Sequence, residues 1–249
     1  MEGIQDRGVE IVSIPAITVK DLVFNYPLKL DSIKNQLTRK PALNDISFEI
    51  PQSSRVLLVG MNGSGKSTLL NCLAGKVRVE NGDVKVLDKN VFYDTTLNND
   101  IVYVKPDEWG IASFSQPPFS STSGNLSVDL SVGEMMNSLQ NDQKSRRDQL
   151  VNILQIDLNW RMNHLLDNER KRVAFFLNLI KPFKILLLDE SMGTLNIIIR
   201  RNLLAWFKKE SQERGCTIVY ATQVTQICFY VLSYVNIHST TCVLYILSK

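Results

Sequence analysis

Histidine and cysteine are scarce in this chain, and that scarcity excludes several classes of site. Two histidines, His164 and His238, occur among 249 residues, so a mechanism that needs a histidine base or a histidine ligand cluster has little material. The four cysteines lie far apart without a CxxC pair, which argues against a zinc site and against a disulfide framework. This cysteine usage suits a reducing compartment, and the expected location is cytoplasmic.

The chain also lacks a strong excess of one charge and internal repeats. With 28 basic and 25 acidic residues, its net charge of +3 does not predict a nucleic-acid surface, so nucleic acid is not an expected partner. The basic groups at 146–147, 170–172 and 200–201 are expected to form solvated helix surface. The first twenty residues mix acidic and basic side chains without a long apolar run, unlike a signal peptide.

Short β-branched and apolar runs alternate with longer segments of helical period, a pattern typical of an α/β fold with a mixed sheet. Strands are expected at 17–24, 46–50, 55–59, 84–86, 101–104, 184–188 and 216–220, and helices at 68–74, 132–139, 146–156, 168–180 and 197–213.

The strongest motif is a glycine-rich loop between a predicted strand and a predicted helix. Residues 60–67 read GMNGSGKS and match the phosphate-loop pattern GxxxxGK(S/T). The glycines let successive backbone N–H groups point at phosphate oxygens, and the helix N-terminus adds the positive end of its dipole. Lys66 is predicted to reach the β- and γ-phosphates, and Ser67 to coordinate Mg²⁺. The predicted nucleotide-binding residues of this region are Gly60, Asn62, Gly63, Ser64, Gly65, Lys66, Ser67 and Thr68.

A second motif is the apolar run at 185–188, which ends in the two acids Asp189 and Glu190. Asp189 is expected to hold Mg²⁺ through water, and Glu190 to polarise the attacking water as general base. An apolar run followed by two acids is often a simple strand end, but together with a phosphate loop it favours a functional site.

With these motifs the sequence resembles the ATP-binding cassettes (ABC), and within them the soluble stand-alone eukaryotic subgroup typified by the yeast CCR-NOT-associated ATPase and its plant relatives. The resemblance covers about 17–223 and rests on the two motifs together with FNY at 24–26, LNWRM at 158–162, KRV at 171–173 and TIVYAT at 217–222.

This resemblance implies a P-loop NTPase core with antiparallel strands at the N-terminus and a small helical subdomain at about 107–172. It also implies ATP and Mg²⁺ as ligands, with Tyr26 stacked on the adenine ring. Residues 1–16 then form an N-terminal segment, 17–223 the ABC domain, and 224–249 an apolar, atypical C-terminal segment.

The sequence departs from the cassette pattern where two subunits would meet. Cassettes generally hydrolyse ATP as head-to-tail dimers, in which a partner's signature segment contacts the γ-phosphate. The signature of this subgroup resembles LSDGQ, whereas 165–169 read LLDNE. Leu166 removes the serine hydroxyl, Asn168 replaces a glycine, and Glu169 brings a negative charge toward a triphosphate. Gln223 stands in place of the switch histidine and can donate a hydrogen bond but carries no charge.

Two smaller departures concern Asn196, which replaces a dimer-contacting Asp, and Pro106, which stands where most cassettes have a Mg²⁺-contacting Gln; Gln116 is a candidate for that role. The residues that bind nucleotide within one subunit are present, whereas those that a partner subunit supplies or that sense the γ-phosphate are largely replaced. We therefore expect ATP binding with weak or partner-dependent hydrolysis. Glu190 and Gln223 are the catalytic candidates. The expected partners are a second ABC domain, in a homo- or heterodimer, or a protein complex, and not a membrane. The alternatives are a non-hydrolysing, nucleotide-dependent interaction module and the ATP-binding subunit of a multi-chain membrane transporter.

The segment 224–249 is strongly apolar, and beyond Val224 its only charged side chain is Lys249. Three hypotheses compete for it: a product of altered splicing, a tail anchor over 227–248, and a pair of buried strands at 227–235 and 242–247 around a polar turn.

Overall fold

A computed structural model describes residues 14–26, 29–31, 36–38, 41–105, 131–138, 143–193, 195–223 and 242–247. The strands are β1 (Ile17–Asn25), β2 (Lys29–Asp31), β3 (Gln36–Thr38), β4 (Pro41–Ile50), β5 (Arg55–Gly60), β6 (Asn81–Val86), β7 (Lys89–Asn90), β8 (Ile101–Val104), β9 (Ile185–Asp189), β10 (Thr217–Thr222) and β11 (Cys242–Leu247). The helices are α1 (Lys66–Leu73), α3 (Val132–Ser138), α4 (Lys144–Leu154), α5 (Asp167–Leu179) and α6 (Ile197–Arg214), with the 3₁₀ turns η1 (Thr95–Asn99) and η2 (Met162–His164). Each strand and helix expected from the sequence is present, with shifted boundaries.

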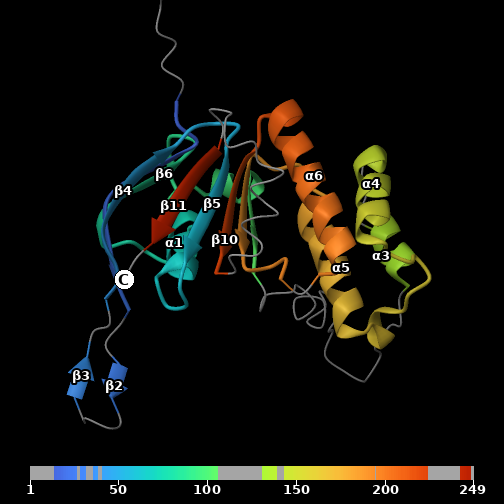
Figure 1. Cartoon of the computed structure of the whole chain (residues 1–249), viewed down its shortest axis with the longest axis horizontal. Coiled ribbons are helices and arrows are strands. Elements are labelled where there is room, and N and C mark those ends of the chain that lie inside the picture. Colours follow the sequence, from blue (N-terminus) through green and yellow to red (C-terminus); the bar gives the residue numbers. More distant parts are fainter. Residues whose placement is uncertain are drawn as a thin grey trace, which may run out of the picture.

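The N-terminal strands form an antiparallel sheet in the order β4-β1-β6-β7, and β2 and β3 form a separate hairpin (Figure 1). Along β1 the side chains of Ile17, Val19 and Leu22 are buried, whereas Lys20 is exposed. Alternation of this kind gives the sheet one apolar face, which must pack against another element.

The second sheet is parallel, in the order β11-β5-β10-β9-β8. All five residues of β9 are buried, and they alternate between two hydrophobic clusters: Leu186 and Leu188 belong to one, Ile185 and Leu187 to the other. A parallel sheet covered on both faces requires such a continuous apolar run. The structure therefore confirms the α/β class, with antiparallel and parallel strands in separate sheets.

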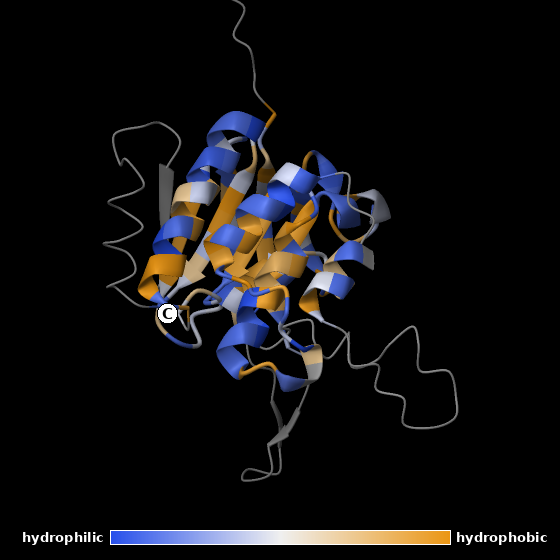
Figure 2. Cartoon of the chain, turned by 90° about the vertical axis from the view of Figure 1, so that its right-hand side faces the viewer, coloured by the Kyte–Doolittle hydropathy of each residue, from blue (hydrophilic) through white to orange (hydrophobic). Residues whose placement is uncertain are grey.

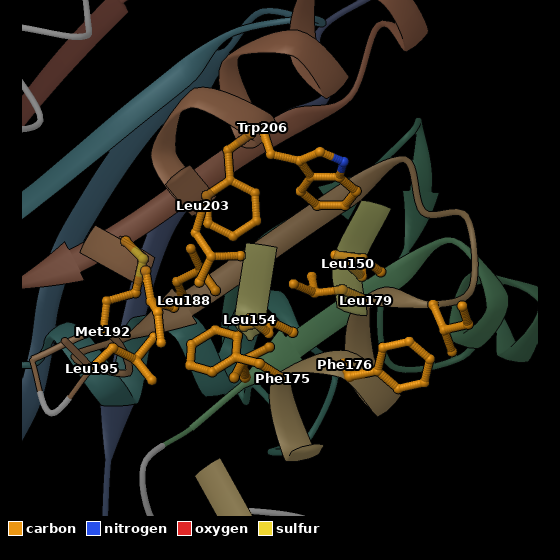
Figure 3. Close-up of a cluster of buried hydrophobic side chains, with 14 of the residues drawn as sticks. Leu150, Leu154, Phe175, Phe176, Leu179, Leu188, Met192, Leu195, Leu203 and Trp206 are labelled. Carbon is orange, nitrogen blue, oxygen red and sulfur yellow. The ribbon is translucent and has the colours of Figure 1, made fainter. Parts of the chain in front are cut away.

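The two clusters lie on opposite faces of the parallel sheet. On one face, α1 contacts β5 and β9 of the parallel sheet as well as β4 and β6 of the antiparallel sheet, so it is enclosed between the sheets. The other face is covered by α3 to α6, which show hydrophilic residues outward (Figures 1 and 2). Figure 3 shows this second cluster, with Leu150 and Leu154 of α4, Phe175, Phe176 and Leu179 of α5, Leu203 and Trp206 of α6, and Leu188, Met192 and Leu195.

The strand β11 agrees with the third hypothesis for the C-terminal segment, because Cys242–Leu247 pairs in parallel with β5. Its proposed partner at 227–235 lies outside the described residues, as does all of 224–241. None of the helices in the part of the chain that the structure describes is long and apolar enough to cross a bilayer.

Arg146 corrects one expectation, because it is buried and not part of a solvated helix surface. Only 6% of this residue is exposed, and its Nη1 lies 2.6 Å from Oε2 of Glu210 on α6. Its Nε donates to the carbonyl of Leu179 at 2.8 Å, and its guanidinium lies against the rings of Phe183 and Trp206. Burial lowers the pKa of Arg146, and the hydrogen bond to Glu210 opposes that shift. Arg146 thus joins α4 to α5 and α6.

We predict that Arg146→Met lowers the free energy of unfolding by about 3 kcal/mol, because it removes the closer member of a buried ion pair and leaves Glu210 with the longer, 3.6 Å contact to the more exposed Arg214. Urea unfolding measures the effect. Arg147→Met, which changes the more exposed neighbour, serves as the control and should cost less than about 0.5 kcal/mol. Combining Arg146→Met with Glu210→Leu should recover part of the loss, and a double variant as unstable as the sum of the single variants would contradict this account.

Candidate functional site

The parallel order of the second sheet brings the carboxyl ends of β5, β9 and β10 to one edge, where Val59 is in register with Thr222, and Asp189 with Ala221. A cavity of about 290 Å³ opens at this edge. The described residues that line it are Tyr26, Ala42, Asn62, Gly63, Gly65, Lys66, Ser67, Thr68 and Glu190. Seven of the predicted nucleotide-binding residues and the predicted general base therefore meet at one cavity.

The glycine-rich loop turns directly into α1, which begins at Lys66 after Gly65. Gly65 has φ 99°, and a Cβ built there would lie 2.8 Å from both the carbonyl oxygen of Ala42 and Cδ2 of Leu43. Only glycine adopts this conformation without strain and also fits under β4. The first N–H groups of α1 lack intrahelical acceptors and stand at the cavity, which makes it suited to an anion.

Lys66 is the basic side chain among the described residues that line the cavity. It is 4% exposed, and its Nζ donates to the carbonyl oxygens of Gly60 at 2.8 Å and Met61 at 3.0 Å. The same Nζ lies 3.4 Å from Oε1 of Glu190, whose Oε2 accepts a hydrogen bond from Nε2 of Gln223 at 2.8 Å. The structure thus joins the predicted phosphate-loop lysine, the predicted general base and the residue at the switch position in one network.

Asp189 is 4% exposed and is not among the residues that line the cavity. The hydroxyl of Tyr103 donates to its Oδ2 at 3.4 Å, whereas its Oδ1 is buried without a hydrogen-bond partner among the described residues. A buried carboxylate oxygen without a partner is unfavourable, so this atom suits a cation or a water bound to one. Sequence reasoning missed Tyr103, since nothing before the strand order is known places β8 beside β9.

The donors present fit a magnesium ion, which prefers oxygen ligands and usually retains several waters. Ser67 lines the cavity, and the buried Asp189 immediately precedes Glu190, which also lines it. No group of three or more His, Cys, Asp or Glu residues occurs within the described ranges, so a bound Mg²⁺ would take its remaining ligands from phosphate and water.

Tyr26 stands at the wall of the cavity. Its hydroxyl is 2.8 Å from Oγ1 of Thr68 on α1, and its ring contacts the ring of Phe24 edge to face, with centroids 5.4 Å apart. Because the residue is still 40% exposed, part of the ring is accessible for stacking on a planar group.

The stretch 165–169 lies at the start of α5 and contributes no residue to the cavity lining that the structure describes. Leu166 occupies the N-cap position, is 68% exposed, and has no side-chain acceptor for the helix. Oε2 of Glu169 accepts the Leu166 N–H at 2.8 Å, so this carboxylate caps its own helix. Asn196 likewise accepts the Ile198 N–H at the start of α6. Pro106 and Gln116 lie outside the described residues.

A parallel strand that leads into a glycine loop, a helix that begins at a buried lysine, and a nearby strand that ends in two acids together define a P-loop nucleotide-binding protein. The sequence profile of the ABC transporter family matches residues 43–193. The chain belongs to this family.

Two plant proteins and one yeast protein are similar to this chain. ABC transporter I family member 20 of Arabidopsis thaliana is 39% identical over 191 residues, which cover 74% of this chain and 56% of that protein. Family member 21 of the same plant is 38% identical over 212 residues, which cover 84% of this chain and 70% of that protein. CCR4-associated factor 16 of Saccharomyces cerevisiae is 34% identical over 221 residues, which cover 86% of this chain and 72% of that protein. The chain therefore spans little more than half of the first relative and about seven tenths of the other two.

Solved structures show the same fold. The dimeric structure of a bacterial ABC transporter cassette has a TM-score of 0.63 at 20% identity and covers 86% of this chain and 90% of that one. The ADP conformation of another ATP-binding cassette has a TM-score of 0.61 at 16% identity, and the match covers 94% of this chain and 87% of that one. Cassettes of this family bind ATP, generally with Mg²⁺, and dimerise, as the dimeric neighbours do.

We predict that Gly65→Ala weakens binding of a fluorescent ATP analogue more than tenfold, because the left-handed backbone and the contact with Ala42 both oppose a Cβ and force the loop to shift. Gly193→Ala is the matched control, since a Cβ there would meet only the Glu190 carbonyl oxygen, at 3.7 Å. Equal analogue affinity of the Gly65→Ala protein and the wild type would show that this conformation is not needed.

Proposed function

We propose that the chain binds ATP and Mg²⁺ in the cavity at the carboxyl ends of β5 and β9, as an ABC-type ATPase whose own hydrolysis is weak or depends on a partner. The observation that carries the proposal is the buried Lys66 ammonium, held by two loop carbonyls and lying 3.4 Å from Glu190 at the mouth of the phosphate loop. A buried cation beside free helical N–H groups is suited to a polyphosphate.

In this proposal different side chains bind the phosphates, the metal and the adenine ring. Lys66 exchanges part of its contacts with Glu190 and the loop carbonyls for β- and γ-phosphate oxygens. Ser67 would coordinate Mg²⁺ and Asp189 would hold it through water, and the ion would neutralise charge on the phosphates. Tyr26 stacks on the adenine ring, with its hydroxyl anchored on Thr68.

Glu190 is the proposed general base. Its Oε2 is oriented by the Gln223 amide, and its Oε1 is freed when Lys66 turns to phosphate, so this oxygen can accept a proton from water. Gln223 is a positioning group here, since an amide donates a hydrogen bond without supplying a charge.

Weak intrinsic hydrolysis follows from the residues at 165–169. In a head-to-tail dimer this stretch would approach the partner's triphosphate with the apolar Leu166 and the carboxylate of Glu169 in place of uncharged hydrogen-bond donors. Loss of one hydrogen bond to a charged group costs about 1.5–3 kcal/mol. A second ABC domain with an intact signature segment is therefore the proposed partner, in a cytoplasmic setting, and the domain is proposed to extend over 17–223.

We predict that Lys66→Ala weakens binding of an ATP analogue by about 10- to 150-fold, which corresponds to one lost charge-assisted hydrogen bond. Fluorescence titration of the purified protein measures this affinity. Lys85→Ala, which removes an exposed lysine of β6 paired with Asp83, is the control and should leave the affinity unchanged. Absence of saturable binding to the wild type, or binding indifferent to Lys66→Ala, would refute the proposed function.

We further predict that replacing Leu166, Asn168 and Glu169 by Ser, Gly and Gln raises steady-state ATP hydrolysis at least tenfold. The Ser and Gln side chains can donate to a γ-phosphate across a dimer, and Gly lets the backbone approach it closely. Leu166→Ser alone should stabilise the protein by about 1 kcal/mol, since it supplies the N-cap acceptor that α5 lacks. Rapid hydrolysis by the wild type would contradict the assignment of these residues as limiting. No hydrolysis by the triple variant, with ATP binding intact, would favour a non-hydrolysing interaction module.

A further inference from the structure

We propose that Tyr103 is a positioning residue for the metal: its hydroxyl holds Oδ2 of Asp189 so that Oδ1 is presented to Mg²⁺. The inference rests on the proposed function for the metal role of Asp189. It extends that function to Tyr103 on β8, a residue that does not itself ligate the ion.

Strand order and register place Tyr103 on the correct face. β8 runs parallel to β9, and Tyr103 is in register with Leu187. Registered residues and residues two apart on one strand share a face, so Tyr103, Leu187 and Asp189 all project toward α1. Leu187 lies in the cluster under α1, and Tyr103 packs against that cluster. The phenol is long enough to reach past Leu187 to Asp189, where its hydroxyl donates to Oδ2 at 3.4 Å.

The contact with Tyr103 makes the two carboxylate oxygens of Asp189 different from one another. The two carboxylate oxygens are chemically equivalent, and rotation about the side chain exchanges them. A hydrogen bond to Oδ2 removes that equivalence and leaves the buried Oδ1 without a partner among the described residues. Because the side chain is 4% exposed, bulk water does not readily satisfy this atom, and a bound cation or its water does.

The ring of Tyr103 is held independently of its hydroxyl. It packs against the cluster under α1, and Nζ of Lys105 lies 4.9 Å from the ring centroid. Phenylalanine preserves both of these contacts, and Tyr103→Phe removes the hydroxyl that donates to Asp189. Loss of a group that orients a metal ligand typically weakens metal affinity 10- to 100-fold.

The test titrates Mn²⁺, as a paramagnetic substitute for Mg²⁺, into the 249-residue chain with and without bound ADP, and measures bound Mn²⁺ by electron paramagnetic resonance and water proton relaxation. Nucleotide affinity in EDTA and the melting temperature are measured in parallel. For Tyr103→Phe we expect Mn²⁺ affinity to fall about tenfold, with nucleotide affinity in EDTA and the melting temperature unchanged. Tyr93→Phe, the same change at an exposed tyrosine, should match the wild type in every measurement. Asp189→Asn should lose at least as much Mn²⁺ affinity as Tyr103→Phe.

Unchanged Mn²⁺ affinity in Tyr103→Phe would overturn the proposal. So would equal losses of Mn²⁺ affinity, EDTA nucleotide affinity and melting temperature, which are the signature of a structural role. Wild-type Mn²⁺ affinity in Asp189→Asn would overturn it as well, because the ligand itself would then be wrong. If the wild type binds no nucleotide, the proposed function fails, and the titration without nucleotide still decides whether Tyr103 orients a metal-binding Asp189.

Discussion

The Lys66 ammonium is nearly buried, and a buried cation is tolerated only where acceptors surround it. Its acceptors come from separate parts of the chain: the carbonyls of Gly60 and Met61 lie at the end of β5, and the Glu190 carboxylate follows β9. These groups meet because β5, β10 and β9 run parallel, side by side, with their carboxyl ends at one edge. The position of Lys66 therefore depends on the order of strands in the parallel sheet, and the rest of the site depends on Lys66.

An apolar framework holds this polar edge in place. Leu69, Leu70 and Leu73 bury α1 between the two sheets and so fix the direction in which its first turn faces the cavity. Burial on the same helix raises the pKa of Cys72 to about 12, so its thiol stays protonated near neutral pH and serves as packing. On the other face, the Arg146–Glu210 pair adds a polar tie between α4 and α6 within a cluster of leucine and aromatic side chains. The site and the helices α3 to α6 thus share one sheet, which is packed on both faces.

Sequence reasoning succeeded where the chemistry is local in the chain. The loop from Gly60 to Ser67 lies between strand and helix as expected, because glycine spacing and the following helical period specify a short-range backbone path. It failed for Arg146, since a charged residue on an amphipathic helix usually faces solvent, and its partner Glu210 is 64 residues away. It also missed Tyr103, which lies 86 residues from Asp189 and reads in sequence as an ordinary strand aromatic.

By itself the sequence determined the α/β class, the phosphate loop, the acidic strand end and the altered stretch at 165–169, because each depends on residue types at fixed short spacing. The tertiary structure alone decided that Lys66 pairs with Glu190, that Gln223 holds the other oxygen of that carboxylate, and that one oxygen of Asp189 is bonded while the other has no partner among the described residues. Such pairings join residues on different strands, and hydrophobic periodicity says which face of a strand is buried but not which strand lies beside it.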